Sequence, residues 1–372
     1  MKKLAAATLI AFLISACAII PSPDTLTLYT SPETGWKSKK IKRAGEVWPL
    51  QQEQQVDPAA ISYTFKDHPY TLKDYLAHTR TTALLIVKEG RVLFETYQYG
   101  CKPSNRFNSA SMAKTITAML IGIALEEGKI KSLDDTAETY VPELRGAGYG
   151  KATIRHLLTM TSGVKWDEDY ANPGSDFGRF TDCQLRSQGC PSTLGFLQQF
   201  NEQANPPGSK FYYSSAETMV LGYVLRAATK QDVTSYTQEK LWSKLGAEDD
   251  AAWMTDRYGI EMVYGWFAAT LRDYGRLGML MANQGARDSQ QIIPLNFWRE
   301  MAAPSAASPG YGYQLWLTPS TGVFFFRGRG GQGIHVDVKQ KLVMVRLAAY
   351  PLSETDDLFE KAVLWEAVRR LQ

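Results

Sequence analysis

Apolar runs rich in strand-forming residues occur in two parts of the chain that lie far apart in the sequence. Two of them, at 82–87 and 92–97, flank the polar segment 88–91 and are typical of a β-hairpin. Three more, at 323–326, 334–338 and 342–347, predict consecutive antiparallel strands near the C-terminal end. Strands from the two regions could therefore join into one sheet.

Between and after these strands, apolar residues recur at helical spacing. They predict helices at 110–127, 153–160, 216–228, 268–283 and 354–371. Gly128 follows the first helix, and glycine is common just after a helix end. This order of elements predicts an α+β fold, with an antiparallel sheet flanked by helices, rather than a doubly wound parallel sheet. We expect one domain over 59–372, with an all-helical insert at about 115–270.

The first residues have the pattern of a bacterial export signal. Two lysines precede a short apolar run at 4–14, and small residues follow, which predicts a signal peptide over 1–16. The segment 14–17 resembles a lipobox, so we expect lipidation of Cys17, although an ordinary secretory signal with a chance cysteine is the alternative. The lipid would anchor the protein at the periplasmic face of the bacterial cell envelope. Ala18 favours the outer membrane over the inner one.

The segment that follows, 17–58, is rich in Pro, Ser, Lys and Gln and is interpreted as a tether with little structure. The formal net charge is +3, and loss of the two lysines of the signal lowers it to about +1, which gives no support for a nucleic-acid partner. Cys183 and Cys190 could close a small loop and leave Cys101 unpaired, although three pairings are possible. The spacing of Cys and His residues predicts no metal site.

The strongest candidate for chemistry is a Ser-x-x-Lys motif formed by Ser111 and Lys114. It lies where a polar segment enters the first predicted helix, so the two side chains share one helix face. A serine needs a base to become a nucleophile, and burial and the helix dipole both lower the pKa of a lysine. A second copy, formed by Ser162 and Lys165, reads as a turn after a helix and lacks this setting. Ser111 is therefore the preferred nucleophile.

Several motifs occur in an order that resembles the serine β-lactamase and penicillin-binding protein superfamily. The resemblance spans about residues 80–370 and is closest to the class C β-lactamase-related group, in particular its 6-aminohexanoate-dimer hydrolase and family VIII esterase branch. It implies a β-lactamase/transpeptidase-like fold and an acyl-enzyme reaction without a cofactor. The matching segments are 111–114, 132–135, 153–163, 207–215 and 328–332.

The resemblance also implies a tyrosine, in a Tyr-x-Asn motif, as the second base or acid. Tyr170 and Asn172 match these letters, whereas Tyr213 matches the setting, because it follows a Pro-Gly turn and precedes an apolar helix. We predict Tyr213 as the catalytic tyrosine, with Ser215 in the place of the asparagine. Ser215 and Tyr170 are then predicted to bind substrate.

The third motif of the family is Lys-Thr-Gly, and the matching segment 325–331 contains no lysine. This departure argues against β-lactamase activity, although Arg327 or Arg329 could hold a carboxylate. The resemblance implies that a backbone N–H here and that of Ser111 form the oxyanion hole. The sequence leaves Gly328 and Arg329 as alternatives for that N–H, and Gly328, Arg329 and Gly330 are predicted to bind substrate.

An acidic segment follows the second Ser-x-x-Lys motif. We interpret it as a solvated loop, with a second possibility that it covers the site together with Trp166 and Tyr170 and favours cationic substrates. Its acidic residues are Asp167, Glu168, Asp169, Asp176 and Asp182.

These observations predict a serine hydrolase of the carboxylesterase or amidase type. It would cleave an ester or amide bond of a small molecule through an acyl-enzyme on Ser111. One alternative is a D,D-peptidase or β-lactamase that acts on peptidoglycan-type substrates. Another is a non-catalytic protein of the cell envelope that kept the fold for binding.

Overall fold

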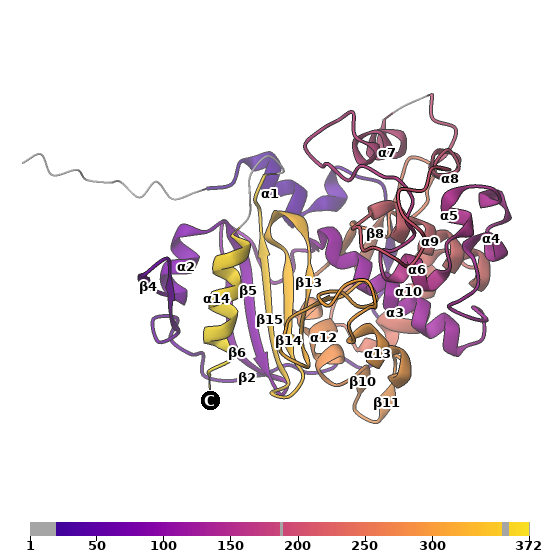
Figure 1. Cartoon of the computed structure of the whole chain (residues 1–372). Coiled ribbons are helices and arrows are strands. Elements are labelled where there is room, and N and C mark those ends of the chain that lie inside the picture. The colour runs from indigo at the N-terminus through magenta and orange to yellow at the C-terminus, as the bar shows by residue number, and fades with distance from the viewer. Residues whose placement is uncertain (1–19, 187–188, 352–356, 372) are drawn as a thin grey trace, which may run out of the picture.

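A seven-stranded sheet forms the centre of the computed structural model, which describes residues 20–186, 189–351 and 357–371 (Figure 1). Its strand order is β12-β13-β14-β15-β5-β6-β2, and every neighbouring pair is antiparallel except β2 with β6. The sheet unites the hairpin with the C-terminal strands, as the sequence predicted. Its strands are β2 (Gln51–Gln52), β5 (Thr81–Lys88), β6 (Arg91–Tyr97), β12 (Trp316–Leu317), β13 (Val323–Arg327), β14 (Gly333–Asp337) and β15 (Leu342–Ala348).

Helices cover both faces of this sheet. On one face, Leu84 and Ile86 of β5 pack with Leu364 and Trp365 of α14 (Leu358–Val368). Neighbouring residues of β5 point the opposite way, into a larger core that includes α12 (Leu271–Ala282). Burial on both sides explains why β5 is a continuous apolar run rather than an alternating one. The first face also carries α2 (Leu72–His78) and the hairpin of β3 (Ser62–Phe65) and β4 (His68–Thr71).

The insert between β6 and the C-terminal strands is mainly helical but not all-helical. Three of its strands, β7 (Phe107–Asn108), β8 (Ala251–Met254) and β9 (Phe267–Ala269), join β1 in a second sheet with the order β1-β8-β9-β7. Its helices are α3 (Ala113–Glu126), α4 (Ala137–Tyr140), α5 (Gly148–Lys151), α6 (Ile154–Leu158), α7 (Asp176–Leu185), α8 (Thr193–Leu197), α9 (Ser215–Thr229), α10 (Val233–Thr237) and α11 (Ser243–Leu245). The short β10 (Ala286–Arg287), β11 (Gln290–Gln291) and α13 (Leu295–Met301) follow α12.

The second sheet corrects the prediction that residues 17–58 form a tether. Within the described part of this segment, α1 (Pro23–Thr30) contacts β7 (Phe107–Asn108), and β1 (Ser38–Ile41) pairs with β8. Tyr29 and Ile41 are buried. A few apolar side chains and the backbone bonds of β1 hold a segment whose average composition is polar. The predicted signal peptide and Cys17 lie outside the described residues.

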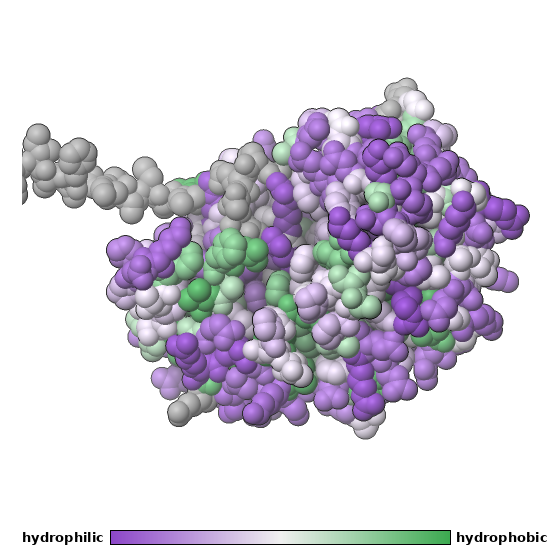
Figure 2. Space-filling view, viewed as in Figure 1, coloured by the Kyte–Doolittle hydropathy of each residue, from purple (hydrophilic) through white to green (hydrophobic). Residues whose placement is uncertain are grey.

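Most of the face shown in Figure 2 is hydrophilic, but a hydrophobic patch lies over the N-terminal end of α14. Phe359, in this first turn, is 78% exposed. Among the residues that the structure describes, no helix is long and apolar enough to cross a membrane.

Candidate active site

The turn that carries Ser111 is held in a strained backbone conformation. Ala110 adopts a φ of 43°. This left-handed backbone conformation is unfavourable for residues that have a side chain, and residues held in it are often found at functional sites. The Ala110 N–H donates to Asn108 Oδ1 at 2.9 Å, and the Ser109 N–H donates to the carbonyl of Phe267 at 2.7 Å. A short 3₁₀ turn over Ala110–Met112 then leads into α3. These bonds fix the partly exposed Ser111 at the start of the helix.

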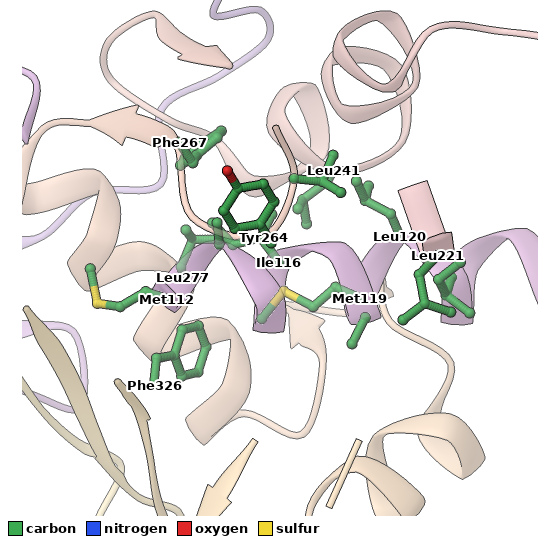
Figure 3. Close-up of a cluster of buried hydrophobic side chains, with 14 of the residues drawn as sticks. Met112, Ile116, Met119, Leu120, Leu221, Leu241, Tyr264, Phe267, Leu277 and Phe326 are labelled. Atoms are coloured by element: carbon green, nitrogen blue, oxygen red, sulfur yellow. The ribbon is translucent and has the colours of Figure 1, made fainter. Parts of the chain in front are cut away.

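The helix itself is anchored by apolar packing on several sides (Figure 3). Met112, just before α3, and Ile116 of α3 are buried in the main core with Phe267, Leu277 and Phe326. Three separate elements, β9, α12 and β13, therefore fix the position of α3 and of the side chains in its first turn.

Lys114 lies beneath Ser111, with Nζ 3.3 Å from Ser111 Oγ. Its side chain is almost completely buried, and Nζ also lies 3.1 Å from Ser215 Oγ and 2.7 Å from the carbonyl oxygen of Tyr264. Burial lowers the pKa of this lysine to about 7, although the negative charge of Glu168 opposes the effect. A large fraction of Lys114 is thus neutral near pH 7 and able to accept a proton.

Tyr213 completes the group around the nucleophile through a side-chain hydrogen bond with Ser111. Its ring stacks on Trp316, with centroids 5.6 Å apart, and Lys114 Nζ lies 5.0 Å from the centroid of the tyrosine ring. Burial raises the pKa of Tyr213, and the nearby Arg327 acts in the opposite direction. The hydroxyl is therefore protonated at neutral pH and can serve as an acid.

Ser215 begins α9 two residues later and connects Lys114 to a carboxylate. Its hydroxyl donates to Glu168 Oε1 at 2.5 Å, and its backbone N–H lies 2.9 Å from Oε2 of the same residue. Glu168 also accepts hydrogen bonds from Trp166 Nε1 at 2.5 Å and from the Tyr170 hydroxyl at 2.8 Å. Tyr170 is thus joined to the site through Glu168.

This arrangement corrects the interpretation of the acidic segment as wholly solvated. Glu168 is partly buried and bonded to three other residues, whereas Asp167 and Asp169 are exposed. Sequence reasoning missed Glu168 because its partner Ser215 is 47 positions away. The aromatic residues two positions before and after Glu168 were a signal that it faces the interior.

The second Ser-x-x-Lys copy does not form such a site. The Ser162 hydroxyl donates to the buried Glu217 at 2.7 Å, and Lys165 is exposed and pairs with Glu202 at 2.9 Å. Serine and lysine are therefore engaged by different partners, and a turn rather than a helix separates them.

The segment that resembles the third motif runs beside the nucleophile turn. A Cβ on Gly328 would lie 2.4 Å from the carbonyl oxygen of Ser109, so only glycine permits this approach. The Gly328 N–H donates to the carbonyl of Gln332 at 3.0 Å. The backbone N–H of Gly328 is therefore already occupied, which favours Arg329 as the second oxyanion donor.

The other residues predicted here have different surroundings. Gly330 adopts a φ of 74°, and a Cβ there would lie 2.3 Å from the Tyr29 ring, so its identity is explained by packing against α1. The Arg329 guanidinium lies 4.9 Å from the centroid of the Tyr170 ring, and that of Arg327 lies 5.6 Å from the Trp316 ring. Two cationic side chains thus flank the group around Ser111.

The other candidates have simpler outcomes. Cys183 in α7 forms a disulfide with Cys190, which precedes α8; this is one of the three possible pairings, and Cys101 is a free thiol. Within the described ranges, no three His, Cys, Asp or Glu side chains are grouped to hold a metal ion.

Comparison with known proteins identifies the family. The family model described as Beta-lactamase matches residues 71–369. The chain belongs to the β-lactamase family. The 6-aminohexanoate-dimer hydrolase of Paenarthrobacter ureafaciens is 27% identical over 353 residues, which cover 87% of this chain and 88% of the relative.

Solved structures agree on the fold. A protein of Bacillus anthracis assigned as a 6-aminohexanoate-dimer hydrolase superposes with a TM-score of 0.82 at 24% identity, over 94% of this chain and 93% of the other. A family VIII carboxylesterase superposes with a TM-score of 0.63 at 16% identity, over 80% and 94%. The predicted family and fold are confirmed, and the chain is a serine hydrolase of the β-lactamase family.

Proposed function

We propose that the protein hydrolyses an ester or amide bond of a small molecule through an acyl-enzyme on Ser111. Neutral Lys114 takes the proton of the Ser111 hydroxyl while Oγ bonds to the substrate carbonyl carbon. When the tetrahedral intermediate collapses, Tyr213 donates its proton to the departing amine or alcohol, and the proton held by Lys114 restores the tyrosine hydroxyl. Water then attacks the acyl-enzyme, and the released acid leaves Ser111 protonated again.

The observation that carries this proposal is the position of Lys114 Nζ, 3.3 Å from Ser111 Oγ in a buried environment that lowers its pKa to about 7. A lysine of ordinary pKa would be charged at neutral pH and could not accept the proton. The oxyanion would be stabilised by the backbone N–H groups of Ser111 and Arg329, because that of Gly328 is engaged by Gln332.

The substrate is proposed to carry a carboxylate near the scissile bond. Arg327 and Arg329 flank the site, whereas the Glu168 carboxylate, which is bonded to Ser215, is occupied by hydrogen bonds. A carboxylated substrate is therefore favoured over the cationic one considered from the sequence. The relative from Paenarthrobacter ureafaciens is named for the 6-aminohexanoate dimer, and the linear form of this amide carries a carboxylate at one end and an amino group at the other, so it is the first amide to test.

The test compares wild-type protein with Ser111→Ala on p-nitrophenyl butyrate and on the amide. We expect hydrolysis by the wild type, loss of it in the variant, and a covalent adduct on the Ser111 peptide by mass spectrometry. A matched control is Ser162→Ala, which removes the other Ser-x-x-Lys serine and should retain turnover. Activity that survives Ser111→Ala would contradict the proposal. Stable labelling by a fluorescent penicillin would favour the D,D-peptidase or β-lactamase alternative.

We also propose that Cys17 is lipidated and anchors this domain at the periplasmic face of the outer membrane. The lipobox-like segment supports this location, and α1 begins at Pro23, only six residues after Cys17. The exposed Phe359 gives an additional apolar contact for a membrane surface. Mass spectrometry of the N-terminal peptide tests the modification, and Cys17→Ala should release the protein into the soluble fraction. An unmodified N-terminus with membrane-free protein would contradict it.

A further inference from the structure

The hydrogen-bond partners of Lys114 restrict the direction in which the lone pair of its neutral amine points. A neutral amine has two N–H groups and one lone pair, and Nζ has three oxygen neighbours: the Tyr264 carbonyl and the hydroxyls of Ser111 and Ser215. The carbonyl can only accept a hydrogen bond, so it takes one N–H. One of the two serine hydroxyls must then accept the other N–H, while the remaining hydroxyl faces the lone pair.

The surroundings of Glu168 decide which serine accepts. Every polar neighbour of its carboxylate in the described structure is a donor: the Ser215 N–H and hydroxyl, the Trp166 indole N–H and the Tyr170 hydroxyl. These four donors match the roughly four lone-pair positions of a carboxylate. The single proton of the Ser215 hydroxyl is thus directed to Glu168, at 2.5 Å. Ser215 Oγ then has only its lone pairs to offer to Lys114.

We propose that Glu168 is a positioning residue, which acts through Ser215 to direct the lone pair of Lys114 towards the hydroxyl of Ser111. The inference rests on the proposed function, because it concerns the base of that reaction. Without the carboxylate, the Ser215 hydroxyl is free to rotate and to donate its proton to Lys114. In that arrangement the lone pair of Lys114 accepts the proton of the Ser215 hydroxyl. Lys114 then donates an N–H to Ser111 instead of accepting the Ser111 proton.

Glu168 also has a second effect, through its charge, which can be measured separately. The carboxylate raises the pKa of Lys114 against the effect of burial. The other groups that face this pair are Tyr213 and Tyr264, whose rings lie near Nζ, and Tyr170 and Glu217, which interact with Glu168. The Arg329 guanidinium lies over the ring of Tyr170, and that of Arg327 lies over Trp316 and acts electrostatically on Tyr213. The charge of Glu168 also raises the pKa values of Tyr170, Tyr213, Tyr264 and Glu217. Burial by itself keeps the three tyrosines protonated across the acid limb, so a shift of that limb reports on the charge of Glu168 acting at Lys114.

The test measures kcat/KM for p-nitrophenyl butyrate as a function of pH in wild type, Glu168→Gln, Glu168→Asp and Ser215→Ala. For Glu168→Gln we expect a loss on the order of 10²-fold, as is typical of a misplaced catalytic group, and an acid limb moved to lower pH. Glu168→Asp keeps the charge but shortens the reach, so it should lose rate with its acid limb close to that of the wild type. Ser215→Ala should lose rate similarly, also without a shift. Glu202→Gln, the same change at the exposed partner of Lys165, should match the wild type in both respects.

The double variant decides whether Glu168 acts through Ser215. If it does, Glu168→Gln should cost little further rate in the Ser215→Ala background, whereas losses that multiply would overturn the proposal. Rates within about threefold of wild type in Glu168→Gln or Ser215→Ala would also overturn it. If Glu168→Gln fails to fold, as judged by its thermal transition, Glu168→Asp takes its place in the cycle with Ser215→Ala, and the same two outcomes decide the question. Wild-type protein that forms no adduct on Ser111 would instead refute the proposed function, so the two failures are distinguishable.

Discussion

The buried lysine should destabilise the protein, and the size of this effect should depend on pH. In the unfolded chain the pKa of Lys114 is near 10.5, whereas in the folded protein burial lowers it to about 7. Between these values the unfolded state binds more protons than the folded state, so this group makes unfolding easier at low pH, and stability rises with pH through the window. The cost to the folded protein is about 4 kcal/mol at pH 7 and about 2 kcal/mol at pH 9.

Lys114→Met removes this titration while keeping an unbranched side chain of similar length. The variant also removes the donor to the Tyr264 carbonyl and to Ser215 Oγ, which costs about 1–3 kcal/mol for each acceptor left without a partner. That second cost does not depend on pH. The difference in unfolding free energy, variant minus wild type, should therefore fall by about 2 kcal/mol between pH 7 and pH 9, whatever its absolute value.

The assay is urea unfolding followed by tryptophan fluorescence at pH 7, 8 and 9. The control is Lys165→Met, because Lys165 is exposed and its salt bridge with Glu202 lies at the surface. This control should show a nearly constant difference from wild type. A difference for Lys114→Met that is equally constant across the three pH values would refute the argument that burial neutralises this lysine.

Three further predictions follow from the same geometry. Below pH 7, kcat/KM for p-nitrophenyl butyrate should fall about tenfold per pH unit, because only neutral Lys114 accepts the proton of Ser111. Initial rates are measured at the isosbestic wavelength of the product, and a kcat/KM that stays constant down to pH 5 would contradict this prediction. Arg327→Gln should raise KM about tenfold or more for an ester that carries a carboxylate but little for a neutral one, and equal changes in steady-state kinetics would exclude a role in charge recognition. Burial raises the pKa of Glu217 well above 4.5, so the contribution of this group to the stability of the wild type decreases as the pH rises above 4.5. The change in unfolding free energy caused by Glu217→Gln, measured by urea unfolding, should therefore be more stabilising at pH 8 than at pH 5. An equal change at the two pH values would contradict a buried, protonated carboxyl.

Much of the fold could be predicted because its signals are local. The strands β5 and β15 are continuous apolar runs because they are buried on both faces of the sheet, whereas β6 alternates between buried and partly exposed positions at its start. The helix that carries Ser111 was equally clear from its apolar period. The N-terminal segment was mispredicted, because Tyr29 and Ile41 are isolated anchors in a polar sequence and β1 gains its bonds from β8, more than 200 positions away.

The site divides in the same way. The Ser111 and Lys114 pair is set by helix spacing, and Tyr213 and Ser215 stand next to the start of a predicted helix, so these positions could be proposed from the sequence. The carbonyl of Tyr264 could not, because a backbone acceptor has no sequence signature. The sequence left Gly328 and Arg329 as alternatives for the second oxyanion donor, and the hydrogen bond from the Gly328 N–H to Gln332, which favours Arg329, joins residues whose pairing no sequence pattern indicates. Glu168 remained hidden within a run of acids that are otherwise exposed.

The hydrogen bond between Ser215 and Glu168 accounts for a serine at the position where the family has an asparagine. The family resemblance places an asparagine where this chain has Ser215, and an amide has a donor and an acceptor at fixed positions. A serine hydroxyl rotates, so the direction of its hydrogen bond depends on what surrounds it. The Glu168 carboxylate supplies that direction, and it is itself held by the Trp166 and Tyr170 side chains. The loss of the amide therefore does not imply a loss of order at the base, because a loop from another part of the chain fixes the orientation that the amide would have provided.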